Sequence, residues 1–367
     1  MKKNINWFIV LSLVMLSSVS CYKNNAHSNT DLIQVTLKLK WKHQFQFAGY
    51  YAALEKGFYE DAGFYVTIIE SSTNTEATQD VLNGDVDFGV GASDLLITRS
   101  EGNPIVLLAS LFQHSPLVFL VREDSGIGHV HDLVGKRVML EPYADELIAY
   151  LHDEGISPDQ FILFPHTHDI SPLINEEVDA MSAYITDEPF LLEEAGIDYI
   201  IISPRLGGID FYGDILFTSE DFLHENPEVV QAFIEASKRG WDYAFNNTNE
   251  VINIILSSYS SRHSRAHLEY EAEKMHQLVI PEIVEFGYMN PGRWDQIIAT
   301  YSRLGMLQND LNLNDFIYSE NTHKPNLLLI VPVGIYVILA ISVLIGLSQV
   351  FTTFSQRILG TYQKKQC

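Results

Sequence analysis

The chain has 367 residues, with 47 acidic against 23 basic side chains and a formal net charge of −24 at pH 7. Such an excess of negative charge repels the phosphate backbone of nucleic acids, so no nucleic-acid partner is expected. The length is enough for two lobes with sizeable cores, and 47% of the residues are hydrophobic.

Residues 1–21 have the pattern of an export signal. Lys2 and Lys3 precede an apolar run at residues 7–15, and small residues then lead to Cys21. Three outcomes stay open: lipidation of Cys21 as in a lipoprotein, ordinary cleavage after Ser20, and an uncleaved anchor. Each of them places the following domain outside the cytoplasm.

The most informative segment lies at residues 37–64 and reads LKLKWKHQFQFAGYYAALEKGFYEDAGF. Its first residues alternate as a half-buried strand does, and from Phe47 the apolar residues repeat at helical spacing as far as Gly57. Side chains at such a corner stand at the carboxyl edge of a sheet, beside a helix N-terminus. Open α/β sheets bind their ligands there.

Strand and helix patterns then repeat along the chain, which predicts parallel sheets with helical crossovers. For a first lobe we expect strands at residues 33–39, 66–70, 86–90 and 105–110 and helices at 47–56, 75–83 and 93–100. Residues 118–121 cross into a second lobe with strands at 137–140, 161–164, 180–183 and 199–202 and helices from about 143, 170 and 188. The chain returns through residues 214–218, followed by helices at 227–245, 251–257, 265–278 and 292–304.

Residues 327–350 are uncharged and almost wholly apolar. A helix of this length spans the roughly 30 Å core of a bilayer, so the pattern predicts a transmembrane helix; a buried core helix is the alternative. The tail at residues 351–367 has basic but no acidic side chains, which is typical of a short cytoplasmic flank. We expect a single-pass cell-membrane protein with a periplasmic main domain and no disulfide, since Cys21 and Cys367 lie on opposite sides.

Five segments resemble the thiamine-pyrimidine synthase family and its relatives of SsuA and NMT type among the type II periplasmic binding proteins. They are residues 49–64, LNGDVDFGVGASDLL at 82–96, residues 113–121, AYITDEPF at 183–190 and DFYGDILFTSEDF at 210–222. The resemblance implies an α/β, two-lobed type II periplasmic-binding-protein fold over about residues 31–320, with a ligand cleft between the lobes. The first lobe would hold about residues 31–117 and 216–320, and the second about residues 118–215.

The candidate ligand-binding residues of the first lobe are Trp41, Gln44, Gln46, Phe47, Tyr50 and Ser93. Aromatic faces stack on a heterocycle, and side-chain amides offer paired donors and acceptors. Phe47 and Tyr50 fit an ordinary helix core equally well. Ser93 follows a turn of small residues and either approaches the ligand or caps its helix.

The second lobe and the hinge supply the other candidates, Glu141, Tyr143, Tyr184, Glu188, Tyr212 and Asp214. Glu188 matches an acidic residue of the family's N-E-P-F-like motif, where a carboxylate accepts hydrogen bonds from an aminopyrimidine. The alternative for Glu188 is an exposed acid in the first turn of a helix, with Asp187 as the cap. Tyr212 and Asp214 either reach the cleft or pack the hinge.

The resembled family includes an enzyme that makes the thiamine pyrimidine from a histidine of its own chain and pyridoxal phosphate, with iron. His43 is the one candidate for that histidine here, and the alternative is an ordinary surface histidine. The enzyme's cysteine-rich iron motif has no counterpart, since no cysteine lies between residues 22 and 366. Two His-x-His pairs, at residues 129–131 and 166–168, lack a third ligand at a recognisable spacing, so no metal site is predicted.

The predicted function is an extracytoplasmic binding or sensor domain for a thiamine pyrimidine precursor or a similar small polar heterocycle. The tail after the membrane helix is too short for an output domain, so we expect either that a signalling partner supplies the output or that the gene is truncated after the helix. One alternative is an ABC-transporter substrate-binding lipoprotein that hands its ligand to a permease. The other is the synthase, which alone would require pyridoxal phosphate, iron and a catalytic residue.

Overall fold

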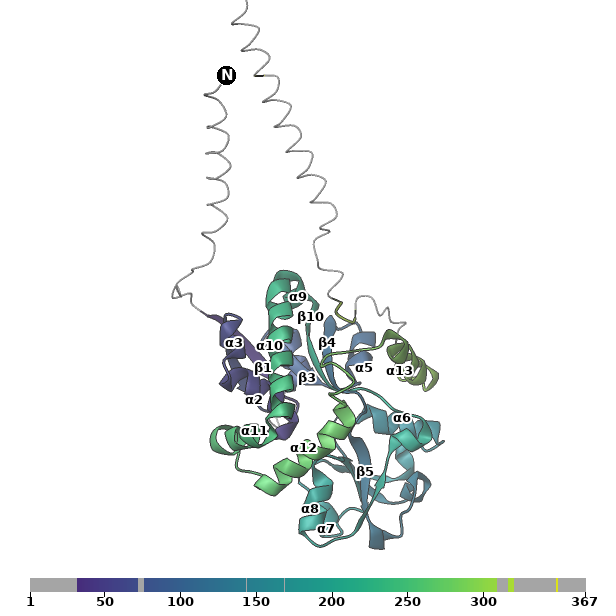
Figure 1. Cartoon of the computed structure of the whole chain (residues 1–367). Coiled ribbons are helices and arrows are strands. Elements are labelled where there is room, and N and C mark those ends of the chain that lie inside the picture. The colour runs from purple at the N-terminus through teal and green to yellow at the C-terminus, as the bar shows by residue number, and fades with distance from the viewer. Residues whose placement is uncertain are drawn as a thin grey trace, which may run out of the picture. The chain divides into compact units, whose positions relative to one another are not determined.

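The computed structural model describes residues 32–71, 76–142, 144–167, 169–308 and 316–319 and Ser348 (Figure 1). The chain divides into two compact units, Met1–Tyr318 and Ser319–Cys367. All elements below belong to the first unit. The predicted export signal and the predicted membrane span lie outside the described residues. Within the described part, no helix is both long and apolar enough to cross a bilayer.

The first lobe is built on a five-stranded sheet in the order β2-β1-β3-β10-β4. Its strands are β1 (Ile33–Lys38), β2 (Phe64–Ile69), β3 (Phe88–Gly91), β4 (Ile105–Phe112) and β10 (Gly213–Ser219). β1 runs parallel to β2 and β3, whereas β10 runs antiparallel to both β3 and β4. Every residue of β4 is buried, which explains its continuous apolar run rather than an alternating one.

The second lobe repeats this arrangement with the order β7-β6-β8-β5-β9. Its strands are β5 (Leu117–Arg122), β6 (Arg137–Leu140), β7 (Ile162–Pro165), β8 (Ala180–Tyr184) and β9 (Tyr199–Ile202). β6 runs parallel to β7 and β8, whereas β5 runs antiparallel to β8 and β9. The chain crosses between the lobes twice, from β4 to β5 and from β9 to β10.

Helices cover both sheets, and the first lobe carries most of them (Figure 1). Around the first sheet lie α2 (Ala48–Glu55), α3 (Phe58–Asp61), α4 (Ala77–Asn83), α5 (Leu95–Ser100), α9 (Glu220–Glu225), α10 (Pro227–Asn246), α11 (Thr248–Ile254), α12 (Arg265–Val279) and α13 (Pro291–Arg303). The second lobe has α6 (Asp145–Asp153), α7 (Ser171–Ile174) and α8 (Glu188–Glu194). A short 3₁₀ turn, η1 (Phe45–Phe47), links β1 to α2.

The packing of α10 on α2 depends on small residues. A Cβ atom on Gly240 would lie 2.1 Å from the carbonyl oxygen of Gly49 and 2.7 Å from the Cβ of Ala53. The next residue, Trp241, is fully buried and fills the space beside Gly49. The two helices therefore approach closely, which holds α2 and the turn before it in place on the first sheet.

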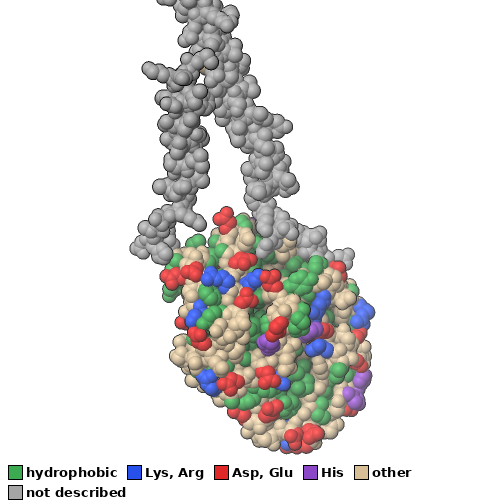
Figure 2. Space-filling model, in the orientation of Figure 1, with side chains coloured by type: hydrophobic (Ala, Val, Ile, Leu, Met, Phe, Trp, Pro, Cys, Tyr) green, Lys and Arg blue, Asp and Glu red, His purple; other side chains and the backbone are tan. Residues whose placement is uncertain are grey.

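The eight predicted strands are all present within the described residues, each within a few residues of the expected bounds, and the two predicted crossing segments, residues 118–121 and 214–218, lie in β5 and β10. The prediction of parallel sheets was wrong in one respect, because each sheet is mixed. β5 and β10 are the strands by which the chain enters a lobe from the other one, so they run against their neighbours. Acidic side chains are spread over the visible face of the folded part rather than gathered on one side (Figure 2).

Candidate functional site

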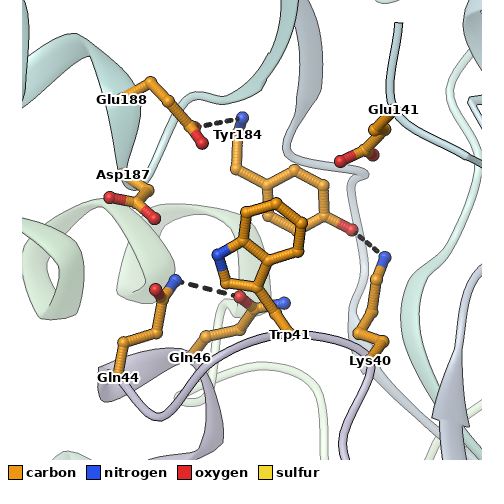
Figure 3. A pocket seen from close by; sticks show the side chains of 8 residues that line it. All are labelled: Lys40, Trp41, Gln44, Gln46, Glu141, Tyr184, Asp187 and Glu188. Carbon is orange, nitrogen blue, oxygen red and sulfur yellow. Dashed lines mark hydrogen bonds between the residues drawn. The ribbon is translucent and has the colours of Figure 1, made fainter. Parts of the chain in front are cut away.

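A pocket lies between the two lobes (Figure 3). We call it the cleft pocket; its lining residues are Lys40, Trp41, Gln44, Gln46, Glu141, Tyr184, Asp187 and Glu188. The first four follow β1, and the others come from the ends of β6 and β8 and the start of α8. They converge because the parallel strands of both sheets direct their carboxyl ends at the cleft. The pocket holds about 250 Å³ of empty space, including open solvent.

A chain of hydrogen bonds orients the two amides of the cleft pocket. Gln44 donates from Nε2 to Gln46 Oε1 over 3.0 Å, and Gln46 donates from Nε2 to Asp214 Oδ2 over 2.7 Å. Arg262 donates to the Oε1 atom of Gln44. Both glutamine side chains are buried. Because each amide already has partners, its donor and acceptor ends are held in fixed directions, which suits recognition of one hydrogen-bonding pattern.

Lys40 joins the two lobes at the other end of the pocket. Its Nζ atom donates to the hydroxyl of Tyr184 and lies 3.8 Å from Asp214 Oδ1. The Tyr184 hydroxyl in turn donates to Asp214 Oδ1 over 3.4 Å. Burial raises the pKa of Asp214, while the charge of Lys40 and the hydrogen bond from Gln46 lower it. Asp214 also has a positive φ of 47°, so surrounding contacts hold it in a strained backbone conformation.

The wall formed by the second lobe is acidic. Glu188 accepts a hydrogen bond from the backbone N–H of Tyr184 over 2.8 Å. Burial, and next the charge of Asp187, raise the pKa of Glu188 well above its ordinary value. Burial also raises the pKa of Glu141, against the opposing effect of Lys40. The raised pKa values favour protonated carboxyls, which donate as well as accept hydrogen bonds.

Asp187 also faces two histidines from the first lobe. Its Oδ1 atom lies 2.8 Å from His267 Nε2 and 3.6 Å from His263 Nε2, and all three side chains are buried. Burial opposes ionisation of Asp187, but the His267 contact and the charges of His263 and Arg262 outweigh it and lower the pKa of Asp187. Burial lowers the pKa of His263 to about 4, so this imidazole is neutral at pH 7.

The turn that carries the glutamines is held by a buried carboxylate of α12. Glu271 accepts hydrogen bonds from the backbone N–H groups of Phe45 and Gln46, each over 2.9 Å. These N–H groups lie at the start of η1, where the chain itself leaves donors without partners. Burial and the nearby charge of Asp187 raise the pKa of Glu271 well above its ordinary value.

The structure brings six of the predicted ligand-binding residues together in the lining of the cleft pocket: Trp41, Gln44, Gln46, Glu141, Tyr184 and Glu188. Asp214 lies one hydrogen bond behind Gln46. Glu188 lines the pocket, so it is not the exposed first-turn acid that the alternative described. Their roles in binding remain predictions.

The other predicted residues are placed elsewhere. Phe47 and Tyr50 are fully buried in the core of the first lobe. The Ser93 hydroxyl bonds to the Tyr301 hydroxyl over 3.0 Å and caps no helix. Tyr212 accepts a hydrogen bond from the backbone N–H of Asn290 over 2.9 Å, which is hinge packing. Tyr143 lies outside the described residues.

Sequence reasoning missed Lys40 and the residues near α12, namely Arg262, His263, His267 and Glu271. The alternating pattern of the strand gave no reason to single out Lys40, although Lys40 lies just after β1, whose carboxyl end faces the pocket. His263 and His267 are four residues apart, the spacing of one helix face, which was a usable signal. Asp187, for which a helix cap was one alternative, stands at the N-cap position of α8, but its side chain makes no capping hydrogen bond.

Comparison with known proteins identifies relatives of several functions. The profile of the family described as NMT1/THI5 like matches residues 44–251. The formylaminopyrimidine-binding protein of Halalkalibacterium halodurans is 26% identical over 309 residues, covering 79% of this chain and 91% of that protein. The riboflavin-binding protein RibY of Chloroflexus aurantiacus is 26% identical, covering 61% of this chain and 66% of that protein. The 4-amino-5-hydroxymethyl-2-methylpyrimidine phosphate synthase of Legionella pneumophila is 25% identical, covering 61% and 73%.

Solved structures share the two-lobed fold. The alkanesulfonate-binding protein SsuA of Xanthomonas axonopodis pv. citri superposes with a TM-score of 0.60 at 13% identity, over 79% of this chain and 99% of that one. The aliphatic sulphonate-binding protein SsuA of Escherichia coli gives a TM-score of 0.58 at 12% identity, over 78% and 92%. These similarities confirm the type II periplasmic-binding-protein fold, and at such low identity they carry no information on the ligand.

Proposed function

Since the chain belongs to the NMT1/THI5 like family, we propose that it is an extracytoplasmic binding protein for a small polar heterocycle of the aminopyrimidine class. The observation that carries the proposal is the composition of the cleft pocket. An indole, two oriented amides and three carboxyl groups from two lobes face one small space (Figure 3). An aminopyrimidine offers amino donors to the carboxyl and amide oxygens, ring nitrogens to the donors, and a flat face to Trp41.

The charges of the pocket favour a neutral or cationic ligand over an anion. Asp187 lines the pocket, and its lowered pKa keeps this side chain negatively charged. The one lysine of the lining, Lys40, is already engaged with Tyr184 and Asp214. A sulfonate would place a second negative charge beside the carboxylate of Asp187 in a partly buried pocket. We therefore do not expect the ligand class of the sulfonate-binding proteins.

The closeness of the two lobes favours a small ligand. As it stands, the pocket has a cavity volume of about 10 Å³, room for about one water molecule. Any organic ligand therefore requires the lobes to move apart, and a single ring requires less opening than a flavin. The formylaminopyrimidine-binding protein supports the same choice, because the similarity extends over most of both chains.

Synthase chemistry does not fit the residues at the cleft. His43 is not among the lining residues, and its Nδ1 atom lies 2.9 Å from the Tyr51 hydroxyl. Both cysteines of the chain, Cys21 and Cys367, lie outside the described residues. The described part therefore offers no thiolate set for iron near the pocket, in contrast to the cysteine-rich motif of the family's enzyme.

Calorimetric titration of the full chain, purified in detergent, tests the ligand class. A formylaminopyrimidine should bind, whereas riboflavin and a short alkanesulfonate should produce no heat of binding at the same concentrations. Lys274→Ala on α12 is the control variant, because Lys274 is remote from the pocket lining. Binding of the sulfonate in preference to the pyrimidine would overturn the proposed ligand class.

We propose further that the domain is tethered to the membrane by residues 327–350 and acts as a sensor for a signalling partner. The apolar and uncharged character of that segment supports the tether. The second candidate is a transport lipoprotein that delivers ligand to a permease, which the small residues before Cys21 favour. Metabolic labelling with palmitate, lost in Cys21→Ser, would support the transport candidate, and its absence would favour the sensor.

A further inference from the structure

Three buried side chains beside the cleft pocket converge on one point. They are Asp187 at the start of α8, His263 just before α12, and His267 in the first turn of α12. One carboxylate oxygen and one nitrogen from each imidazole lie within 4.8 Å of one another. The exposed fraction of each residue is 8% or less. We call these residues the Asp-His-His cluster.

The ligating atoms of the cluster lack hydrogen-bond partners. Asp187 Oδ1, His263 Nε2 and both ring nitrogens of His267 are buried and make no hydrogen bond. His267 Nε2 and Asp187 Oδ1 are 2.8 Å apart and attract each other as an ion pair does, whereas His263 Nε2 and His267 Nδ1 have no hydrogen-bond partner. Buried polar atoms are almost always paired, so several orphaned atoms at one point call for a missing partner.

We infer that the Asp-His-His cluster binds one divalent transition-metal ion of the zinc class. Imidazole nitrogens and a carboxylate oxygen are the ligands that Zn²⁺ takes from proteins, at about 2.0–2.2 Å. Tetrahedral ligands at these distances stand about 3.3 Å apart. The 2.8 Å and 3.6 Å contacts of Asp187 Oδ1 bracket this value, so an ion can enter after small shifts of side chains.

The surrounding carboxyl groups agree with a cation at this place. Glu188 and Glu271 are both close enough to Asp187 for its charge to act on them, so two further carboxyl groups offer oxygen atoms beside the cluster. Arg262 is the opposing cation, 4.0 Å from the Asp187 carboxylate. Its guanidinium also donates to Gln44, so it already has a partner when the ion takes up Asp187.

Zinc at this site would connect the two lobes. Asp187 belongs to the second lobe and also lines the cleft pocket, whereas both histidines come from the α12 region of the first lobe. Three protein ligands leave at least one coordination position for water or for a ligand atom. The ion therefore favours the closed cleft, since opening would separate Asp187 from the histidines.

Zinc binding is measured on the full chain, purified in detergent without a polyhistidine tag and stripped with a chelator. Equilibrium dialysis against ZnCl₂ followed by elemental mass spectrometry should give one tightly held ion per chain. His263→Ala and His267→Ala should each weaken that binding about 100-fold or more. Asp187→Asn should do the same while keeping the size of the side chain, and circular dichroism checks that each variant folds.

The control replaces the exposed pair His129 and His131 by alanine; their rings lie 5.8 Å apart on the surface. This double variant should keep the ion. Wild type that retains only trace zinc would overturn the inference, and so would folded His263, His267 or Asp187 variants that bind as wild type does. The organic ligand is left out, so the result does not depend on whether the proposed aminopyrimidine is correct.

Discussion

Glu146 links the stability of the fold to pH through the hinge. It lies in the first turn of α6, its exposed fraction is 4%, and it faces the Ser115 side chain and the Phe211 backbone. Ser115 and Phe211 belong to the two segments that cross between the lobes, and Ser115 donates its N–H to the Phe211 carbonyl over 2.9 Å. Burial raises the pKa of Glu146 from 4.5 to about 8, outweighing the opposing effect of both contacts.

A carboxyl with a raised pKa in the folded state keeps a proton that the unfolded chain releases. Its contribution to stability is fully present below about pH 4.5 and is lost as the pH rises toward about 8. The loss is about 1.4 kcal/mol per pH unit in this window, or about 3 kcal/mol by pH 7. Glu146→Gln stays neutral at every pH, so it should match wild type near pH 5 and be more stable at pH 8.

Urea titrations of wild type and Glu146→Gln at several pH values from 5 to 8, followed by tryptophan fluorescence, measure the difference. Burial also raises the pKa of Asp94 to about 7, so this group too lowers the stability as the pH rises, equally in wild type and in Glu146→Gln. The comparison between the two proteins removes that contribution. Exposed Glu225→Gln is the control and should follow wild type. If the stability of Glu146→Gln and of wild type falls equally as the pH rises, the inference that Glu146 is protonated in the folded protein is wrong.

Three further changes test the pocket, the packing and the topology. Trp41→Ala removes a stacking face from the cleft pocket and should weaken ligand binding by about 1–3 kcal/mol, roughly 5- to 150-fold, in calorimetric titration with Lys274→Ala as control. Gly240→Ala places a Cβ atom 2.1 Å from a backbone oxygen of α2 and should destabilise the fold by about 1–3 kcal/mol or more in urea, whereas Gly128→Ala, with nothing closer than 3.9 Å, should be close to neutral. A reporter fused after Cys367 should be active only if it functions in the cytoplasm; activity of a reporter that requires the periplasm would contradict the proposed membrane topology.

The strands of the fold were predictable because alternation and apolar runs report burial directly. β4 is buried at every residue and was expected from its continuous apolar sequence. Strand direction was not predictable in the same way, because a pattern of burial is identical whichever way a strand runs. The antiparallel pairing of β5 and β10 follows from the route of the chain between the lobes, which only the assembled sheets reveal.

The site was predictable where it depends on the ends of strands. Trp41, Gln44 and Gln46 follow β1, and the carboxyl end of a parallel strand faces the cleft whatever lies opposite. Helical periodicity could not decide between core and pocket for Phe47 and Tyr50, because it identifies the buried face and not its neighbours. The residues near α12 could not be predicted for another reason. Arg262 and Gln44 are 218 positions apart in the chain, and no local pattern indicates that such distant residues meet.

The contacts of α12 separate the parts of the pocket that persist when the cleft opens from those that do not. Glu271 holds the η1 turn by two hydrogen bonds, and both partners belong to the first lobe. The His267 contact with Asp187 and the Lys40 contact with Tyr184 join different lobes. Movement of the second lobe therefore breaks the contacts of Asp187 and Tyr184 while the glutamines stay oriented. A ligand meets a wall that is already ordered on the first lobe, and the free energy of closure depends on the few groups that the second lobe contributes.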